Sequence, residues 1–216
     1  MGRVWYPNIQ FTFRYVDQAA GIKVWKSTTV TNFVTAPSDN LDKRSSKSDQ
    51  FTITVDPATP NKYTIVGQYD DEVAISIVYE RLAEGWKLGA GPRGGMSYFG
   101  SLAEEKVPPG TTPDSASGSD GFAVHRFWPR CAISGIVRLN QSVIDMDNSR
   151  GMFVHAIQGM RPDSLAARWN FANFQSTAEG GEGVSLVMME FKTTSAYGDV
   201  VVNVGSVVVK DRLIAI

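Results

Sequence analysis

The sequence predicts an all-β protein, an antiparallel barrel or sandwich with very little helix. The dominant hydrophobic period is two residues, which is the period of a half-buried strand. Val, Ile, Thr and aromatic residues dominate about a dozen short windows that are separated by turn residues. Helical periodicity is poor along the 216 residues. These observations disfavour a parallel α/β sheet of the kind that binds nucleotides.

The predicted strands follow one another closely along the chain. Residues 11–16, 51–55 and 73–79 alternate apolar with polar side chains, as half-buried strands do. Further windows of similar composition complete the predicted set: 22–28, 63–67, 124–128, 132–139, 152–157, 168–174, 185–192 and 199–204.

Three segments differ from this pattern. Residues 162–168 begin with a proline that can open a single helical turn, which then runs into an aromatic strand pattern. Residues 36–48 are polar and charged, which predicts a long solvated loop. Residues 102–121 are rich in Pro, Gly and Ser and have almost nothing to bury, so we expect a disordered insertion.

The composition disfavours several classes of protein. Twenty-one basic and 22 acidic residues give a net charge of −1, so nucleic acid is not an expected partner. The single cysteine, Cys131, cannot form an internal disulfide. No segment approaches the ~20 apolar residues that span a bilayer, and the first residues lack the apolar core of a secretory signal. We therefore expect a cytoplasmic protein.

Short motifs do not indicate a catalytic or metal site. Residues 89–94 match G-x-G-x-x-G, but no helical period follows, so we interpret them as a turn. Residues 140–142 match a glycosylation sequon and residues 145–151 resemble a calcium loop. We interpret both as hairpin turns, the second because it lacks the required glycine and glutamate. One Cys and two His do not suffice for a zinc site, and we expect no cofactor.

Aromatic and polar side chains are densest between residues 98 and 175. A strand over residues 168–175 places Trp169, Phe171, Asn173 and Gln175 on one face, and Arg168, Asn170, Ala172 and Phe174 on the other. Two interpretations remain open. One is a core with hydrogen-bonded polar inserts, and the other is an apolar cavity with a few fixed polar groups, the anatomy of a small-molecule site.

The same stretches resemble the fungal survival factor 1 family, whose members contain two tandem lipocalin-like β domains. The longest matching segments are GMFVHAIQGMRP at 151–162 and AARWNFANFQ at 166–175. Shorter ones are WKST at 25–28, TNF at 31–33, YFG at 98–100, HRFWPRC at 125–131, MMEF at 188–191 and VNVG at 202–205. The match covers nearly the whole chain except the predicted insertion.

The resemblance implies two incomplete tandem lipocalin-like domains. Residues 1–129 would form an N-terminal domain that lacks its first strands, and residues 130–216 the beginning of a second. It also implies an intracellular carrier of ceramide or a similar long-chain lipid, linked to survival of oxidative stress. Peripheral contact with endoplasmic reticulum or Golgi membranes is implied where the family's N-terminal docking segment is present.

We therefore expect a non-enzymatic lipid-binding module. The residues expected near the lipid are Tyr98, His125, Trp128, Arg130, His155, Gln158, Arg168, Trp169, Asn170 and Asn173. Two alternatives stay open. One is a hydratase or pericyclase of the related barrel superfamily with His155 as general acid or base. The other is a truncated chain with no function of its own, with exposed apolar edge strands.

Overall fold

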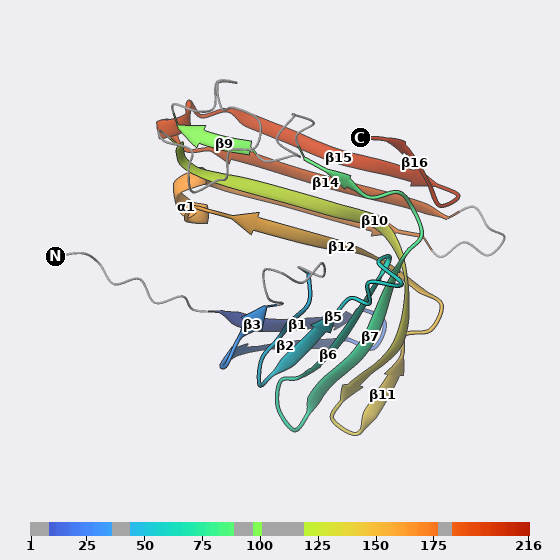
Figure 1. Ribbon diagram of the computed structural model, residues 1–216. Helices are drawn as coiled ribbons and strands as arrows, with labels where there is room; N and C mark the ends of the chain where they lie inside the picture. Colours follow the sequence, from blue (N-terminus) through green and yellow to red (C-terminus); the bar gives the residue numbers. More distant parts are fainter. Residues whose placement is uncertain (1–8, 36–43, 89–96, 101–118, 177–182) are drawn as a thin grey trace. The chain divides into compact units, whose positions relative to one another are not determined.

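A computed structural model describes residues 9–35, 44–88, 97–100, 119–176 and 183–216. The predicted turn at 89–94 and most of the predicted loops at 36–48 and 102–121 lie outside these residues. Within them, regular structure is almost entirely antiparallel β, as predicted (Figure 1). In the described part of the chain, helix is limited to α1 (Pro162–Leu165) and the 3-10 turn η2 (Ser195–Tyr197). The predicted fold class is therefore confirmed.

The chain forms two compact units that are interleaved in sequence. The first contains residues 1–80 and 132–149, and the second contains residues 81–131 and 150–216. The long strand β10 (Ser119–Leu139) passes from the second unit into the first between Cys131 and Ala132. The domain boundary predicted between residues 129 and 130 falls inside this strand and stays a prediction.

The first unit contains a sheet with the order β11-β10-β7-β6-β5-β4-β3 and a separate hairpin of β1 and β2. Side chains of Phe11 and Phe13 from the hairpin pack against the buried cluster around Val73 and Val137. The Phe11 ring stacks on Tyr69 with 4.0 Å between centroids. The strands are β1 (Gln10–Asp17), β2 (Ile22–Thr29), β3 (Val34–Thr35), β4 (Ser46–Lys47), β5 (Phe51–Thr54), β6 (Lys62–Gln68), β7 (Val73–Arg81) and β11 (Ser142–Asp145).

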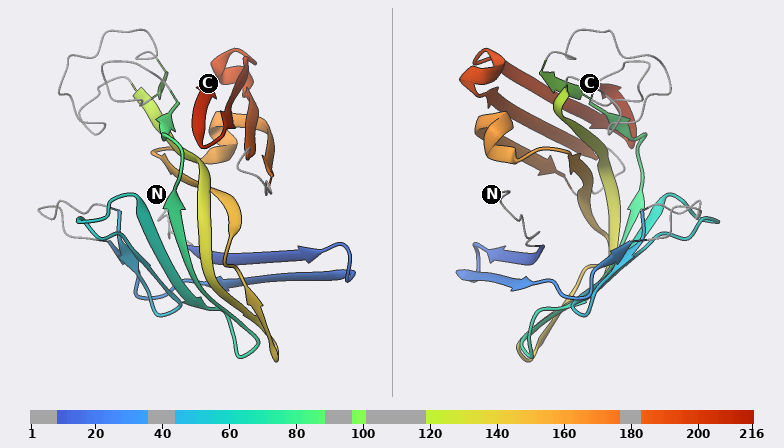
Figure 2. Two further views of the ribbon diagram at one scale, coloured as in Figure 1. Left: turned by 90° about the vertical axis from the view of Figure 1, so that its right-hand side faces the viewer. Right: turned by 60° about the vertical axis from the view of Figure 1, so that its left-hand side comes forward.

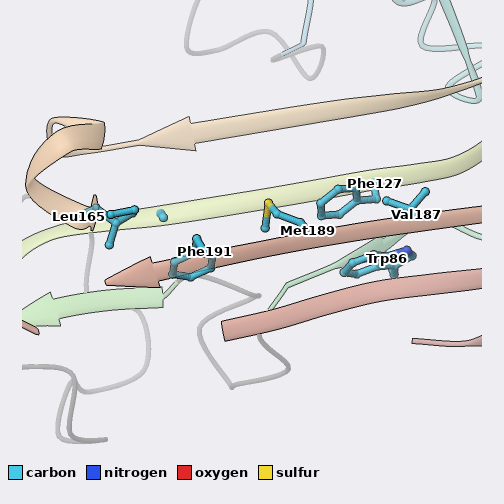
Figure 3. Close-up of a cluster of buried hydrophobic side chains, with 8 residues drawn as sticks. Trp86, Phe127, Leu165, Val187, Met189 and Phe191 are labelled. Atoms are coloured by element: carbon cyan, nitrogen blue, oxygen red, sulfur yellow. The ribbon is translucent and has the colours of Figure 1, made fainter. Parts of the chain in front are cut away.

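The second unit has two layers, which Figure 2 shows from two further sides. In one layer β8 (Trp86–Lys87), β9 (Ser97–Gly100) and β12 (Ser149–Gln158) pair with β10. The other layer is a sheet of β13 (Ala166–Gln175), β14 (Val184–Thr193), β15 (Val201–Val209) and β16 (Arg212–Ala215), in that order. Phe127 and Trp86 of the first layer pack on Val187, Met189 and Phe191 of the second (Figure 3).

Most predicted strands and turns are confirmed. The hairpin turns at 140–142 and 145–151 are present, with Asn140 and Asn148 at positive φ, and the helical turn begins at Pro162. One prediction was wrong: the windows 124–128 and 132–139 form one continuous strand rather than two. Backbone hydrogen bonds continue past Pro129, since the Arg130 carbonyl accepts from the Leu82 N–H at 3.0 Å and the Ala83 N–H at 3.4 Å.

Candidate functional site

An apolar groove of about 580 Å³ lies within the second unit. Small-molecule sites occupy roughly 300–1,000 Å³, so its size suits an organic ligand. Five structural elements contribute to its lining. The lining residues are His125 and Phe127 of β10, Met152, Val154, Ala156 and Gln158 of β12, Pro162 of α1, Trp169, Asn170, Phe171 and Asn173 of β13, and Met189 of β14.

Strand alternation explains the apolar walls. Successive side chains of a strand point to opposite faces, so Met152, Val154 and Ala156 of β12 share one face. By the same period Trp169 and Phe171 share one face of β13. Because β12 belongs to one layer and β13 to the other, the groove lies between strands of the two layers.

His125 supplies a neutral polar atom to the groove. The residue is 6% exposed, and its ring centroid lies 6.1 Å from that of Trp169 and 6.3 Å from that of Phe127. Its Nδ1 is buried and has no hydrogen-bond partner among the described residues. Burial lowers the pKa of His125 below its ordinary value, since desolvation penalises the charged ring. The imidazole is therefore uncharged at neutral pH.

Three amide side chains accompany this histidine. Asn170 Nδ2 donates to Glu190 Oε1 at 2.8 Å, and Asn173 Oδ1 accepts from Gln175 Nε2 at 2.9 Å. Gln158 is the last residue of β12 and lies close in sequence to α1. The groove thus combines apolar walls with a few polar groups, none of which carries a formal charge.

The structure brings together five of the ten residues predicted to bind the ligand: His125, Gln158, Trp169, Asn170 and Asn173 all line the groove. It places the other five elsewhere. Tyr98 is buried, with its ring 6.4 Å from Phe122, and it lines a separate hollow with Phe99 and Tyr197.

Trp128 and Arg130 belong to β10, like the lining residues His125 and Phe127, but they do not line the groove. The Trp128 ring lies 5.7 Å from that of Phe153 and beneath the Arg81 guanidinium. Arg130 is 3% exposed, and its Nε donates to Asp211 Oδ1 at 2.8 Å. Its Nη1 and Nη2 donate to the Ser176 carbonyl at 3.3 and 3.2 Å. Arg130 therefore ties β10 to the second layer and to the turn between β15 and β16.

His155 and Arg168 do not line the groove. His155 lies between Val154 and Ala156, which both line the groove, so alternation directs it to the other face of β12. Arg168 is exposed and pairs with Glu190 at 2.9 Å. Both residues were predicted to contact the ligand because they lie in the same segments as the lining residues.

The residues predicted to bind the ligand did not include the apolar lining residues Phe127, Met152, Val154, Ala156, Pro162, Phe171 and Met189. Strict alternation from Gln158 would have found three of the β12 residues, since 152, 154, 156 and 158 share a face. Phe127 and Met189 sit on different layers, and only the tertiary fold brings them together.

The position of His155 bears on the enzyme alternative. Among the described residues no group of three or more His, Cys, Asp or Glu could hold a metal ion. The enzyme alternative required His155 to face the cavity, but His155 does not line it. That alternative is therefore not supported.

Comparison with known proteins identifies the family. A sequence profile of the Svf1 family matches residues 1–216. The chain belongs to the Svf1 family. The resemblance to the fungal survival factor 1 family is thereby confirmed. No solved structure matches the chain.

Svf1 family proteins of several fungi are similar to this chain. A ceramide-binding protein of Aspergillus fumigatus is 40% identical over 152 residues, which cover 70% of this chain and 33% of that protein. One of Candida albicans is 32% identical over 207 residues, covering 95% of this chain and 47% of that protein. One of Schizosaccharomyces pombe is 29% identical over 212 residues, or 98% of this chain. The chain therefore spans about half the length of relatives matched along nearly all of it.

No helix in the described part of the chain is long and apolar enough to cross a membrane.

Proposed function

We propose that the chain binds a long-chain, ceramide-like lipid in the groove of its second unit and acts without catalysing a reaction. The observation that carries this proposal is the groove itself, whose walls are apolar and whose polar groups are uncharged. The relatives in Aspergillus, Candida and Schizosaccharomyces are named ceramide-binding proteins, which supports ceramide as the class of ligand.

Exposed aromatic side chains in the groove also support an apolar occupant. Phe171 is 54% exposed and Trp169 is 37% exposed, although both line the groove. Large exposed apolar groups that cluster in one place usually mark a binding surface. Burial of each methylene of an acyl chain contributes about 0.8 kcal/mol, so ten methylenes contribute roughly 8 kcal/mol before the costs of association.

A titration with a fluorescent short-chain ceramide that carries a nitrobenzoxadiazole group tests the proposal. We expect saturable binding, with quenching of tryptophan emission because Trp169 lines the groove. Replacement of Trp169 by Phe is expected to remove much of the quenching while leaving binding measurable. Absence of saturable binding by the wild-type chain would contradict the proposal.

We also propose that the protein works in the cytoplasm, in peripheral contact with endoplasmic reticulum or Golgi membranes, and supports survival of oxidative stress. Membership of the Svf1 family supports this proposal. Fractionation of cells and growth of a deletion strain on peroxide test it. A uniformly nuclear protein, or a deletion strain with unchanged peroxide tolerance, would contradict it.

A further inference from the structure

The interior of the second unit contains three buried polar atoms that have no hydrogen-bond partner among the described residues. They are Trp86 Nε1, His125 Nδ1 and Ser206 Oγ. Buried donors and acceptors are nearly always paired in folded proteins, so an unpaired one calls for an explanation. Of these three residues His125 alone lines the groove. His125 is therefore the one of the three residues that a ligand in the groove would contact.

The groove offers no charge to an ionised ligand. Its lining contains no Lys, Arg, Asp or Glu. Arg168 and Glu190 are adjacent in sequence to the lining residues Trp169 and Met189, but they pair with each other at 2.9 Å. Arg126 follows His125 on β10 and is exposed, as alternation requires. Arg168 is therefore already paired with a carboxylate, and Arg126 points to the opposite face of β10 from His125.

We propose that His125 selects the polar group of the lipid: its Nδ1 forms a hydrogen bond with a hydroxyl or amide of an uncharged lipid, and the groove discriminates against lipids with an ionised group. This inference rests on the proposed function, that the groove binds a lipid. The Trp169 and Phe127 rings, at 6.1 and 6.3 Å from the imidazole, enclose the bond in an apolar setting.

The physical basis is the cost of moving a charge out of water. A carboxylate in an apolar site without a cation loses its hydration and gains no partner. A hydroxyl loses less hydration and regains one hydrogen bond from an atom that is otherwise unpaired. Two ligands of equal chain length are therefore expected to differ in affinity because of the polar end alone.

Competition between matched ligands tests the inference. Dodecanol and laurate have the same chain length, and each is used to displace the fluorescent ceramide from the wild-type chain at pH 7.5. We expect dodecanol to displace it at about tenfold lower concentration than laurate. Equal or stronger displacement by laurate would overturn the inference while leaving lipid binding intact. Failure of the fluorescent ceramide to bind at all would overturn the proposed function as well.

Two variants locate the selectivity. His125→Leu removes the hydrogen bond and is expected to weaken dodecanol binding about tenfold while leaving laurate within threefold of wild type. His125→Asn keeps a polar atom close to the position of Nδ1, and we expect it to retain most of the preference for dodecanol. Wild-type dodecanol affinity in a folded His125→Leu chain would overturn the inference. If the leucine variant does not fold, the relative affinities of the wild-type chain and of His125→Asn for dodecanol and laurate still test the inference.

Nuclear magnetic resonance gives a readout that a merely structural role would not change. The chain contains only two histidines, so replacing His155 by Gln assigns the ¹⁵N signals of His125. Dodecanol is expected to shift the Nδ1 resonance of His125. An unchanged Nδ1 resonance at saturating dodecanol would overturn the proposed bond.

Discussion

Filling the groove with one side chain should block lipid binding without unfolding the protein. Ala156 lines the groove and is exposed, so a larger side chain has room there. A tryptophan has roughly 150–250 Å² of surface to bury. If it displaces 150 Å² of lipid contact at ~25 cal/mol/Å², the loss of binding free energy is about 4 kcal/mol. A change of about 1.4 kcal/mol corresponds to a tenfold change in affinity, so the loss of affinity for the lipid is at most several hundredfold.

The matched control is Ala172→Trp. Ala172 is exposed on β13, but it pairs with Met188, which is 43% exposed and does not line the groove. We expect Ala156→Trp to weaken binding of the fluorescent ceramide at least tenfold and Ala172→Trp to leave it within twofold. Urea denaturation should show both variants within about 0.5 kcal/mol of wild type, as is usual for exposed positions. Wild-type affinity of Ala156→Trp, or an equal loss in Ala172→Trp, would refute the assignment of the groove.

Further predictions concern stability. Arg130→Met should lower the free energy of unfolding in urea by about 3 kcal/mol because it leaves buried acceptors unpaired. Arg168 is exposed, so Arg168→Met should change the free energy of unfolding by less than about 1 kcal/mol. Equal effects of the two variants would contradict this prediction. The pKa of His125 is lower in the folded chain than in the unfolded chain. Below about pH 6.5 the unfolded chain therefore binds a proton at His125 more readily than the folded chain does, and the free energy of unfolding should fall as the pH drops. His125→Asn should reduce the loss of unfolding free energy between pH 7.5 and 5.5, and an equal loss in the variant and the wild type would refute this prediction. Gly135→Ala should destabilise the chain by about 2 kcal/mol or more, because φ is +107° and a Cβ would collide with the neighbouring strand. Gly21 has φ +69° but no atom near a built Cβ, so Gly21→Ala should lower the free energy of unfolding by only about 1 kcal/mol. An equal loss at both positions would contradict the close contact of Gly135 with the neighbouring strand.

Local sequence pattern predicted the fold class and most strands because their side chains alternate between core and solvent. The two-residue strands β3, β4 and β8 were not predicted, since two residues carry no period. The strand break expected before Ala132 is absent because backbone hydrogen bonds hold β10 on both sides of Cys131. The Arg130 carbonyl accepts from the Leu82 and Ala83 N–H groups, and β11 pairs with residues 136–139.

The candidate site was predicted only in part for a different reason. Trp169 and Asn173 were placed together from the alternation of one strand, and both line the groove. Arg130 was predicted to contact the ligand, but its partner Asp211 lies 81 positions further along the chain. Sequence pattern does not reveal such a long-range pairing. The same holds for Met189, which reaches the groove from the second layer.

Mass spectrometry of lipid extracted from the purified chain shows whether the groove holds a lipid. We expect an uncharged long-chain lipid at close to one molecule per chain in the wild type and in Ala172→Trp, and its near absence in Ala156→Trp. Recovery of no acyl-chain lipid from the folded wild-type chain, or of equal amounts from all three chains, would contradict it.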